Sequence, residues 1–69
     1  MSAETQINEM ARRIRNVLGS RGEMTLADLE MTVDASPQLL DFGLGWLVRE
    51  NKVEILSETA GTKVRLKFN

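Results

Sequence analysis

The spacing of hydrophobic residues predicts two helices in the first half of the chain. Over residues 3–18, apolar side chains recur every three or four positions, which is the period of an amphipathic α-helix. Gly19 is expected to end this helix, and residues 23–24 have room only for a minimal strand. A shorter helix over residues 26–33 is favoured by Thr25, whose hydroxyl can cap the first turn.

The segment after Ser36 predicts a third helix that is unusually apolar. The Ser36 hydroxyl can accept a hydrogen bond from the first turn, and Pro37 stands where a missing N–H costs nothing. At about 100° per residue, the apolar side chains fill one broad arc. We therefore expect a central helix with Trp46 buried in the core. The narrow opposite stripe consists of Gln38, Asp41, Gly45 and Arg49.

Beyond Asn51 the hydrophobic period changes from that of a helix to that of a strand. Two alternating segments, residues 52–55 and 63–68, predict a β-hairpin that turns at residues 59–62. Gly61 supplies a residue that can adopt positive φ in that turn. The resulting order of helix, short strand, two helices and hairpin predicts a winged helix-turn-helix, an α+β fold, formed by residues 1–69 as one domain.

This pattern also resembles a known family. The run Gly45-Trp46-Leu47-Val48-Arg49-Glu50, preceded by the segment Met24 to Leu29, resembles small stand-alone prokaryotic winged helix-turn-helix domains of unassigned function. The resemblance covers nearly the whole chain, and the run at residues 45–50 is its most specific part. It implies the winged fold and, through the family's name, a nucleic-acid-binding role in transcriptional control.

Charge weighs against strong DNA binding. The chain has nine Lys and Arg residues against ten Asp and Glu residues, for a net charge of −1, whereas affinity for nucleic acid comes mainly from an excess of basic side chains. The hairpin is expected to oppose Lys63 to Glu58 and Lys67 to Glu54, with Arg65 opposite Leu56. We therefore expect weak DNA binding at best. The candidate contacts are Arg12, Arg13, Gln38, Arg49 and Arg65.

The alternative function is a protein-interaction or dimerisation module that does not bind DNA on its own. A chain of 69 residues buries only about 60% of its unfolded surface, so its stability margin is thin. With no cysteine available for disulfides, self-association is the remaining means of stabilisation, and we expect a homodimer. The candidate interface residues are Phe42 and Val48, at the margins of the apolar arc, and Leu66 and Phe68 in the terminal strand.

Other classes of function find little support in this sequence. It has no histidine or cysteine, no glycine-rich phosphate loop and no carboxylate spacing typical of a metal site. We therefore expect neither an enzyme nor a cofactor, and no small-molecule substrate is evident. No apolar run approaches the roughly 20 residues of a membrane span, and residues 1–6 lack the apolar centre of an export signal. A cytoplasmic protein is expected.

Overall fold

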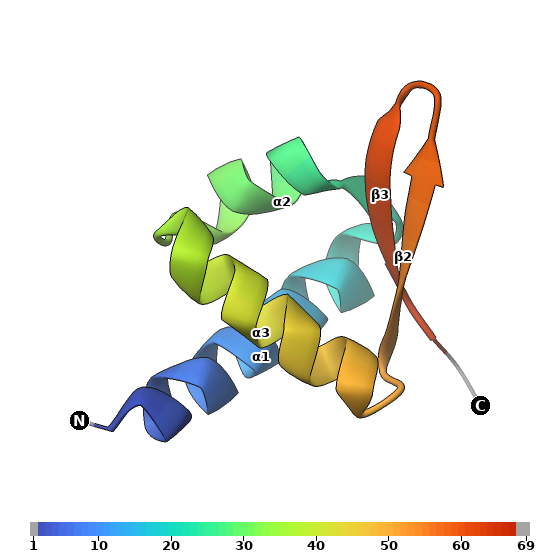
Figure 1. The fold of residues 1–69 in the computed structure, drawn as a ribbon. Helices are drawn as coiled ribbons and strands as arrows, with labels where there is room; N and C mark the ends of the chain where they lie inside the picture. Colours follow the sequence, from blue (N-terminus) through green and yellow to red (C-terminus); the bar gives the residue numbers. More distant parts are fainter. Residues whose placement is uncertain (1, 68–69) are drawn as a thin grey trace.

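The computed structural model describes residues 2–67, and its elements follow the predicted order (Figure 1). They are α1 (Ala3–Arg21), β1 (Met24–Thr25), α2 (Leu26–Val33), α3 (Pro37–Arg49), β2 (Val53–Glu58) and β3 (Gly61–Leu66). Helices α2 and α3 form the helix-turn-helix, and β2 and β3 form the wing. Strand β1 pairs with β3, which gives an antiparallel sheet of order β1-β3-β2. The predicted winged helix-turn-helix fold is confirmed.

Each helix begins at a residue whose hydroxyl accepts a hydrogen bond from the backbone N–H three positions ahead. The pairs are Ser2 with Thr5 (3.2 Å), Thr25 with Asp28 (3.1 Å) and Ser36 with Leu39 (3.2 Å). Such bonds satisfy donors that have no partner within the helix. The predicted helix starts at Thr25 and Ser36 are therefore confirmed, because both hydroxyls make the expected capping hydrogen bonds.

Helix α1 ends later than its sequence predicts. It continues through Gly19 to Arg21, and Gly22 follows with φ of +80°. The Gly22 N–H donates to the Leu18 carbonyl over 2.8 Å. The expected stop at Gly19 is wrong because the left-handed backbone that glycine tolerates best is needed at Gly22.

Helix α3 passes into β2 through a tight C-terminal turn. Asn51 adopts a left-handed conformation with φ of +61°, and the Lys52 N–H donates to the Leu47 carbonyl over 2.9 Å. This six-to-one bond is the mark of a Schellman motif, which satisfies carbonyls at the end of a helix. Helix α3 and the wing are therefore joined by a turn whose backbone groups are hydrogen-bonded.

The core lies where the helices meet the inner face of the sheet, and every element contributes to it. In Figure 1, α3 crosses in front of α1. At this crossing a Cβ added to Gly43 would lie only 2.7 Å from Met10 Cγ and 3.2 Å from Ile14 Cδ1, so the helices pack through a position without a side chain. The buried apolar residues are Met10, Ala11, Ile14, Leu18, Met24, Leu29, Val33, Leu40, Leu44, Leu47, Val53 and Val64.

The register of the hairpin differs from the prediction by two residues. Only Thr59 and Ala60 lie between the strands, and Gly61 already pairs with Glu58. The partners are therefore Lys63 with Leu56 and Arg65 with Glu54. A shift of two residues leaves each side chain on its expected face, because side chains alternate with a period of two.

Strand β3 is the central strand of the sheet, which changes where a free edge is found. It pairs with β2 from Gly61 to Leu66 and with β1 at Lys63 and Val64. At Lys63 and Val64, therefore, both backbone edges of β3 are already paired within the chain. The full-length outer edge belongs to β2, because β1 has only two residues.

We predict that Ser36→Ala destabilises the fold by about 0.5–2 kcal/mol, because the Leu39 N–H loses its acceptor. Urea unfolding followed by circular dichroism measures the change. Ser20→Ala is the control, since Ser20 is exposed within α1 and no described residue bonds to its side chain. Equal stability of the Ser36 variant and the wild type would show that the cap contributes nothing.

A second prediction concerns the helix crossing. Gly43→Ala should destabilise by about 1–3 kcal/mol through overpacking against Met10 and Ile14. The matched control is Gly19→Ala in α1, where the new Cβ would meet only Leu66 Cδ1 at 3.9 Å. That variant should gain up to about 1 kcal/mol from helix propensity. If both variants shift the urea midpoint in the same direction, the close packing at Gly43 is not a constraint.

Candidate interaction surface on helix α3

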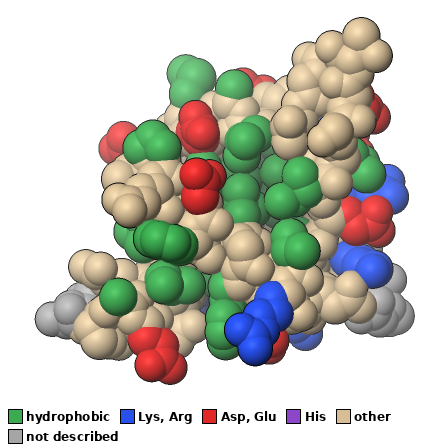
Figure 2. Space-filling view, viewed as in Figure 1, with side chains coloured by type: hydrophobic (Ala, Val, Ile, Leu, Met, Phe, Trp, Pro, Cys, Tyr) green, Lys and Arg blue, Asp and Glu red, His purple; other side chains and the backbone are tan. Residues whose placement is uncertain are grey.

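The outward face of α3 combines apolar and polar side chains. The buried positions of the helix are Leu40, Gly43, Leu44 and Leu47. On the remaining surface Phe42 is 53% exposed, Val48 45% and Trp46 41%. In Figure 2 hydrophobic side chains extend across the face that α3 shares with α2 and the wing, with acidic side chains among them. The visible Lys and Arg side chains lie toward the C-terminal end of α3 and the wing side.

The burial predicted for Trp46 is wrong. At about 100° per residue, Trp46 lies about 110° around the helix from the middle of the buried set, so neighbouring elements cover only part of its side chain. Phe42 lies four residues earlier and about 150° from that middle, so it points almost directly away from the core. The apolar arc of α3 is wider than the surface available to bury it.

A row of three residues runs along the middle of this outward face. Asp41, Gly45 and Arg49 follow one another at intervals of four, so they line up along the helix. All three are exposed. A Cβ added to Gly45 would meet no atom within 4 Å, so this glycine, unlike Gly43, has no neighbour in its own chain that requires it. We call this row together with Phe42, Trp46 and Val48 the α3 face.

The basic side chains proposed for DNA contact do not form a continuous patch. Arg13 reaches from α1 to α2, where its Nη2 donates to the Val33 carbonyl. No basic residue stands in the last turn of α2, so Arg13 supplies both a donor and a positive charge to that helix end. The Arg13 side chain therefore joins α1 to the C-terminal end of α2.

The wing carries acidic partners for its basic residues. Arg65 Nη2 lies 3.2 Å from Glu54 Oε2. Lys63 Nζ lies 3.3 Å from Glu58 and 3.8 Å from Glu23. These exposed pairs add little stability, yet they lower the positive field along the wing. The expected pairing of Lys63 with Glu58 is present. Glu54 pairs with Arg65 in place of the expected Lys67, whose Nζ donates to Asn51 Oδ1 over 2.7 Å.

The remaining candidates lie in different places. Arg12 is exposed on α1, and Gln38 and Arg49 share the outward side of α3, about 16 Å apart along its axis. Within residues 2–67, none of these arginines has an ion-pair partner. Leu66 packs partly against the core and contributes less exposed surface than Phe42. Phe68 lies outside the described residues.

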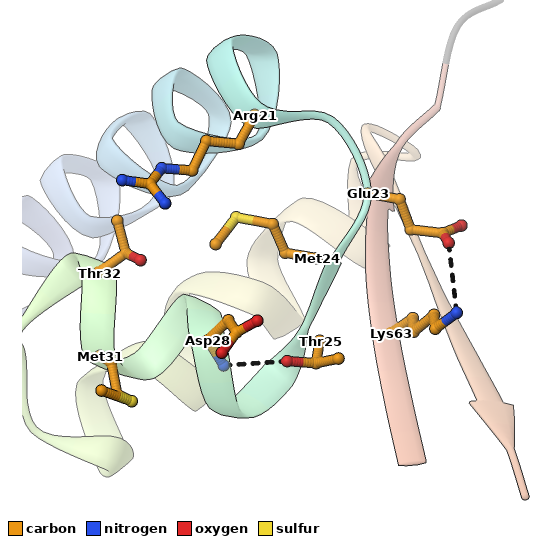
Figure 3. Close-up of a pocket in the computed structure, with 8 residues that line it drawn as sticks. All are labelled: Arg21, Glu23, Met24, Thr25, Asp28, Met31, Thr32 and Lys63. Carbon is orange, nitrogen blue, oxygen red and sulfur yellow. Dashed lines mark hydrogen bonds and ion pairs between the residues drawn. The ribbon is translucent and has the colours of Figure 1, made fainter. Parts of the chain in front are cut away.

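A polar hollow lies between β1, α2 and β3 (Figure 3). Its Thr25 hydroxyl caps α2, and its Lys63 ammonium pairs with Glu23. Within residues 2–67, no group of three His, Cys, Asp or Glu side chains is placed to hold a metal ion. The hollow is lined by Arg21, Glu23, Met24, Thr25, Asp28, Met31, Thr32 and Lys63.

Sequence reasoning missed three exposed apolar side chains. Besides Trp46, these are Met31 of α2, which is 79% exposed, and Ile55 of β2, which is 44% exposed. One signal was present in the sequence: Phe42 and Trp46 stand four residues apart beside Gly45, which places both on one side of α3 next to a residue without a side chain.

None of the helices formed by residues 2–67 has the length and the apolar character needed to span a membrane.

Comparison with known proteins identifies the domain type. The family model described as "Winged helix-turn-helix domain (DUF2582)" matches residues 1–66. No curated protein and no solved structure gives a significant match.

The contact made by Arg13 generates a third prediction. Arg13→Ala should destabilise the fold by about 1.5–3 kcal/mol, the usual contribution of a hydrogen bond to a charged group, since the Val33 carbonyl loses its donor. Arg12→Ala, one position away on α1, removes the same charge and should change the unfolding free energy by less than about 0.5 kcal/mol. Chemical denaturation at one ionic strength compares the two. Equal losses in both variants would rule out the specific bond.

Proposed function

The chain belongs to the DUF2582 family of winged helix-turn-helix domains, and we propose that it uses α3, the recognition helix of that fold, to bind protein rather than to read DNA. The observation that carries the proposal is the exposure of Phe42, Trp46 and Val48 on α3. Large apolar side chains exposed together on a small domain are typical of protein interaction sites. The proposed role is an interaction module with no enzymatic step.

The outward side of α3 is poorly suited to base recognition. A helix in the major groove recognises bases through side-chain donors and acceptors, mostly near its N-terminal end. Here Gln38 is the one such group at that end, Arg49 stands in the last turn, and Asp41 between them would repel phosphates. The aromatic ring of Phe42 also lies on this outward side, about 150° from the middle of the buried set.

The charge distribution supports the same proposal. Binding to DNA requires basic side chains that displace counterions from phosphates. In this domain Arg65 and Lys63 lie beside carboxylates, and Arg13 donates to a backbone carbonyl. Arg12, without an ion-pair partner among residues 2–67, supports a second proposal: weak nonspecific contact with nucleic acid, outside the α3 face. A role in transcriptional control would then depend on a partner protein.

The fourth prediction uses Trp46 as a probe, because it is the single tryptophan of the sequence. Fluorescein-labelled random duplex DNA is titrated with the protein at low and at physiological salt, and anisotropy gives the affinity. We expect a Kd no tighter than about 10⁻⁶ M at physiological salt, as for nonspecific binding. In the reverse titration with unlabelled duplex, Trp46 emission and its quenching by acrylamide should not change.

Two variants make this test specific to α3. Gln38→Ala and Arg49→Ala should leave the weak affinity for duplex DNA almost unchanged, because α3 does not enter the groove. Nanomolar binding that both variants abolish, together with a shift in Trp46 emission on adding DNA, would overturn the proposal and establish α3 as a DNA-reading helix.

A further inference from the structure

The α3 face has a symmetry in its sequence that is not required by the fold. Gly45 stands at the centre of the exposed row, with Asp41 four residues before it and Arg49 four residues after it. At 1.5 Å per residue, each charge lies about 6 Å from Gly45 along the helix axis. Within residues 2–67 neither charged side chain has an ion-pair partner. Asp41 and Arg49 therefore place opposite charges at equal distances from Gly45.

Building on the proposed function, we infer that the protein bound by the α3 face is a second copy of this chain, with the two α3 helices crossing about a twofold axis at Gly45. A twofold contact must be self-complementary, because each patch meets itself in reverse order. Reversal about Gly45 places Asp41 opposite Arg49 of the second copy, and Arg49 opposite the second Asp41. The contact therefore contains two pairs of opposite charges.

The apolar side chains lie on the two sides of this row. At about 100° per residue, Phe42 and Val48 lie about 60° from Gly45 in opposite directions around the helix, so the reversal places Phe42 beside Phe42 of the second copy and Val48 beside the second Val48. Both side chains are about half exposed in the single chain, and Trp46 beside them is 41% exposed. Each of these side chains would lose contact with water in the complex.

Gly45 has a defined part in this arrangement. A glycine within a helix costs about 1 kcal/mol relative to alanine, and nothing in its own chain lies within 4 Å of the position a Cβ would take. At a crossing angle near −50°, the rows of residues spaced by four on two helices run parallel. A glycine at the crossing point allows the two backbones to approach and lets the flanking side chains meet.

The size of the contact sets the expected affinity. A contact confined to one face of a 13-residue helix is expected to bury less than the roughly 800 Å² per partner of a standard interface. Self-association is therefore expected with a Kd of about 10–100 µM, in the range of weak and transient interfaces. Domains at low micromolar concentration would be mostly single, and the α3 face would become covered as concentration rises.

The test measures self-association and the environment of Trp46 in parallel. Sedimentation equilibrium from about 2 to 500 µM gives the mass, and Trp46 emission is recorded over the same series. We expect the mass to rise from 7.8 kDa toward twice that value as the emission shifts to shorter wavelength. Both changes should share one midpoint, because the association itself buries Trp46.

Charge exchange identifies the contact. Asp41→Arg places like charges opposite each other twice and should weaken association about tenfold or more. Combining it with Arg49→Asp restores opposite charges, and the double variant should return to within about threefold of the wild-type Kd. Only a reversed pairing of residues 41 and 49 predicts this rescue.

Replacing Gly45, at the proposed twofold axis, with alanine distinguishes an effect on association from an effect on folding. Gly45→Ala should raise the urea midpoint of the dilute protein, through helix propensity, while weakening association about tenfold by keeping the backbones apart. Gly19→Ala, at an exposed glycine of α1, is the matched control: it should gain stability similarly and leave the Kd unchanged. Opposite signs for folding and association exclude a simple folding defect in the Gly45 variant.

The inference is overturned by a 7.8 kDa monomer at every concentration, or by a dimer whose Kd neither Asp41→Arg nor Gly45→Ala changes. A monomer whose Trp46 emission does not respond to DNA would remove the second copy as partner and leave the proposed function standing. A change in Trp46 emission on adding DNA would contradict the proposed function, whatever the oligomeric state.

Discussion

The close crossing of α1 and α3 at Gly43 is the contact on which the rest of the domain depends. A side chain at this position would overlap Met10 and crowd Ile14, so the two helices can pack this closely only on the glycine. Because α3 packs against α1 at Gly43, this contact also determines how α3 is rotated about its own axis. Once Gly43 faces α1, Leu40, Leu44 and Leu47 turn toward the core, and the residues opposite them turn toward solvent.

The outward composition of α3 follows from that rotation. A recognition helix with polar residues on its free side would be suited to DNA, but here the free side carries Phe42, Trp46 and an open glycine. Leaving apolar side chains exposed to water costs roughly 25 cal/mol per Å² of apolar surface. The other elements of this small domain leave these side chains partly uncovered. A protein surface laid over α3, as proposed above, would remove that cost.

The charged residues of the domain are used largely within the chain. Arg13 binds the end of α2, and the wing pairs Arg65 with Glu54. These contacts hold elements that are separate in sequence, and they reduce the positive field that would attract DNA. The row of Asp41 and Arg49 is different, because its charges lack ion-pair partners among the described residues.

What the sequence determined by itself is local. The caps at Thr25 and Ser36 depend on a hydroxyl and an N–H three residues away, and the hydrophobic periods of 3.6 and 2 reflect the geometry of single elements, so the order of elements and the winged fold could be predicted. The tertiary structure decided which part of the wide apolar arc of α3 is covered, because covering depends on where α1 lies. For the same reason, only the folded chain shows that Trp46 is exposed and that Arg13 reaches Val33, because both depend on distances between residues far apart in the chain. The folded chain also shows that the hairpin turns at Thr59 and Ala60, because side-chain alternation leaves the register free by steps of two.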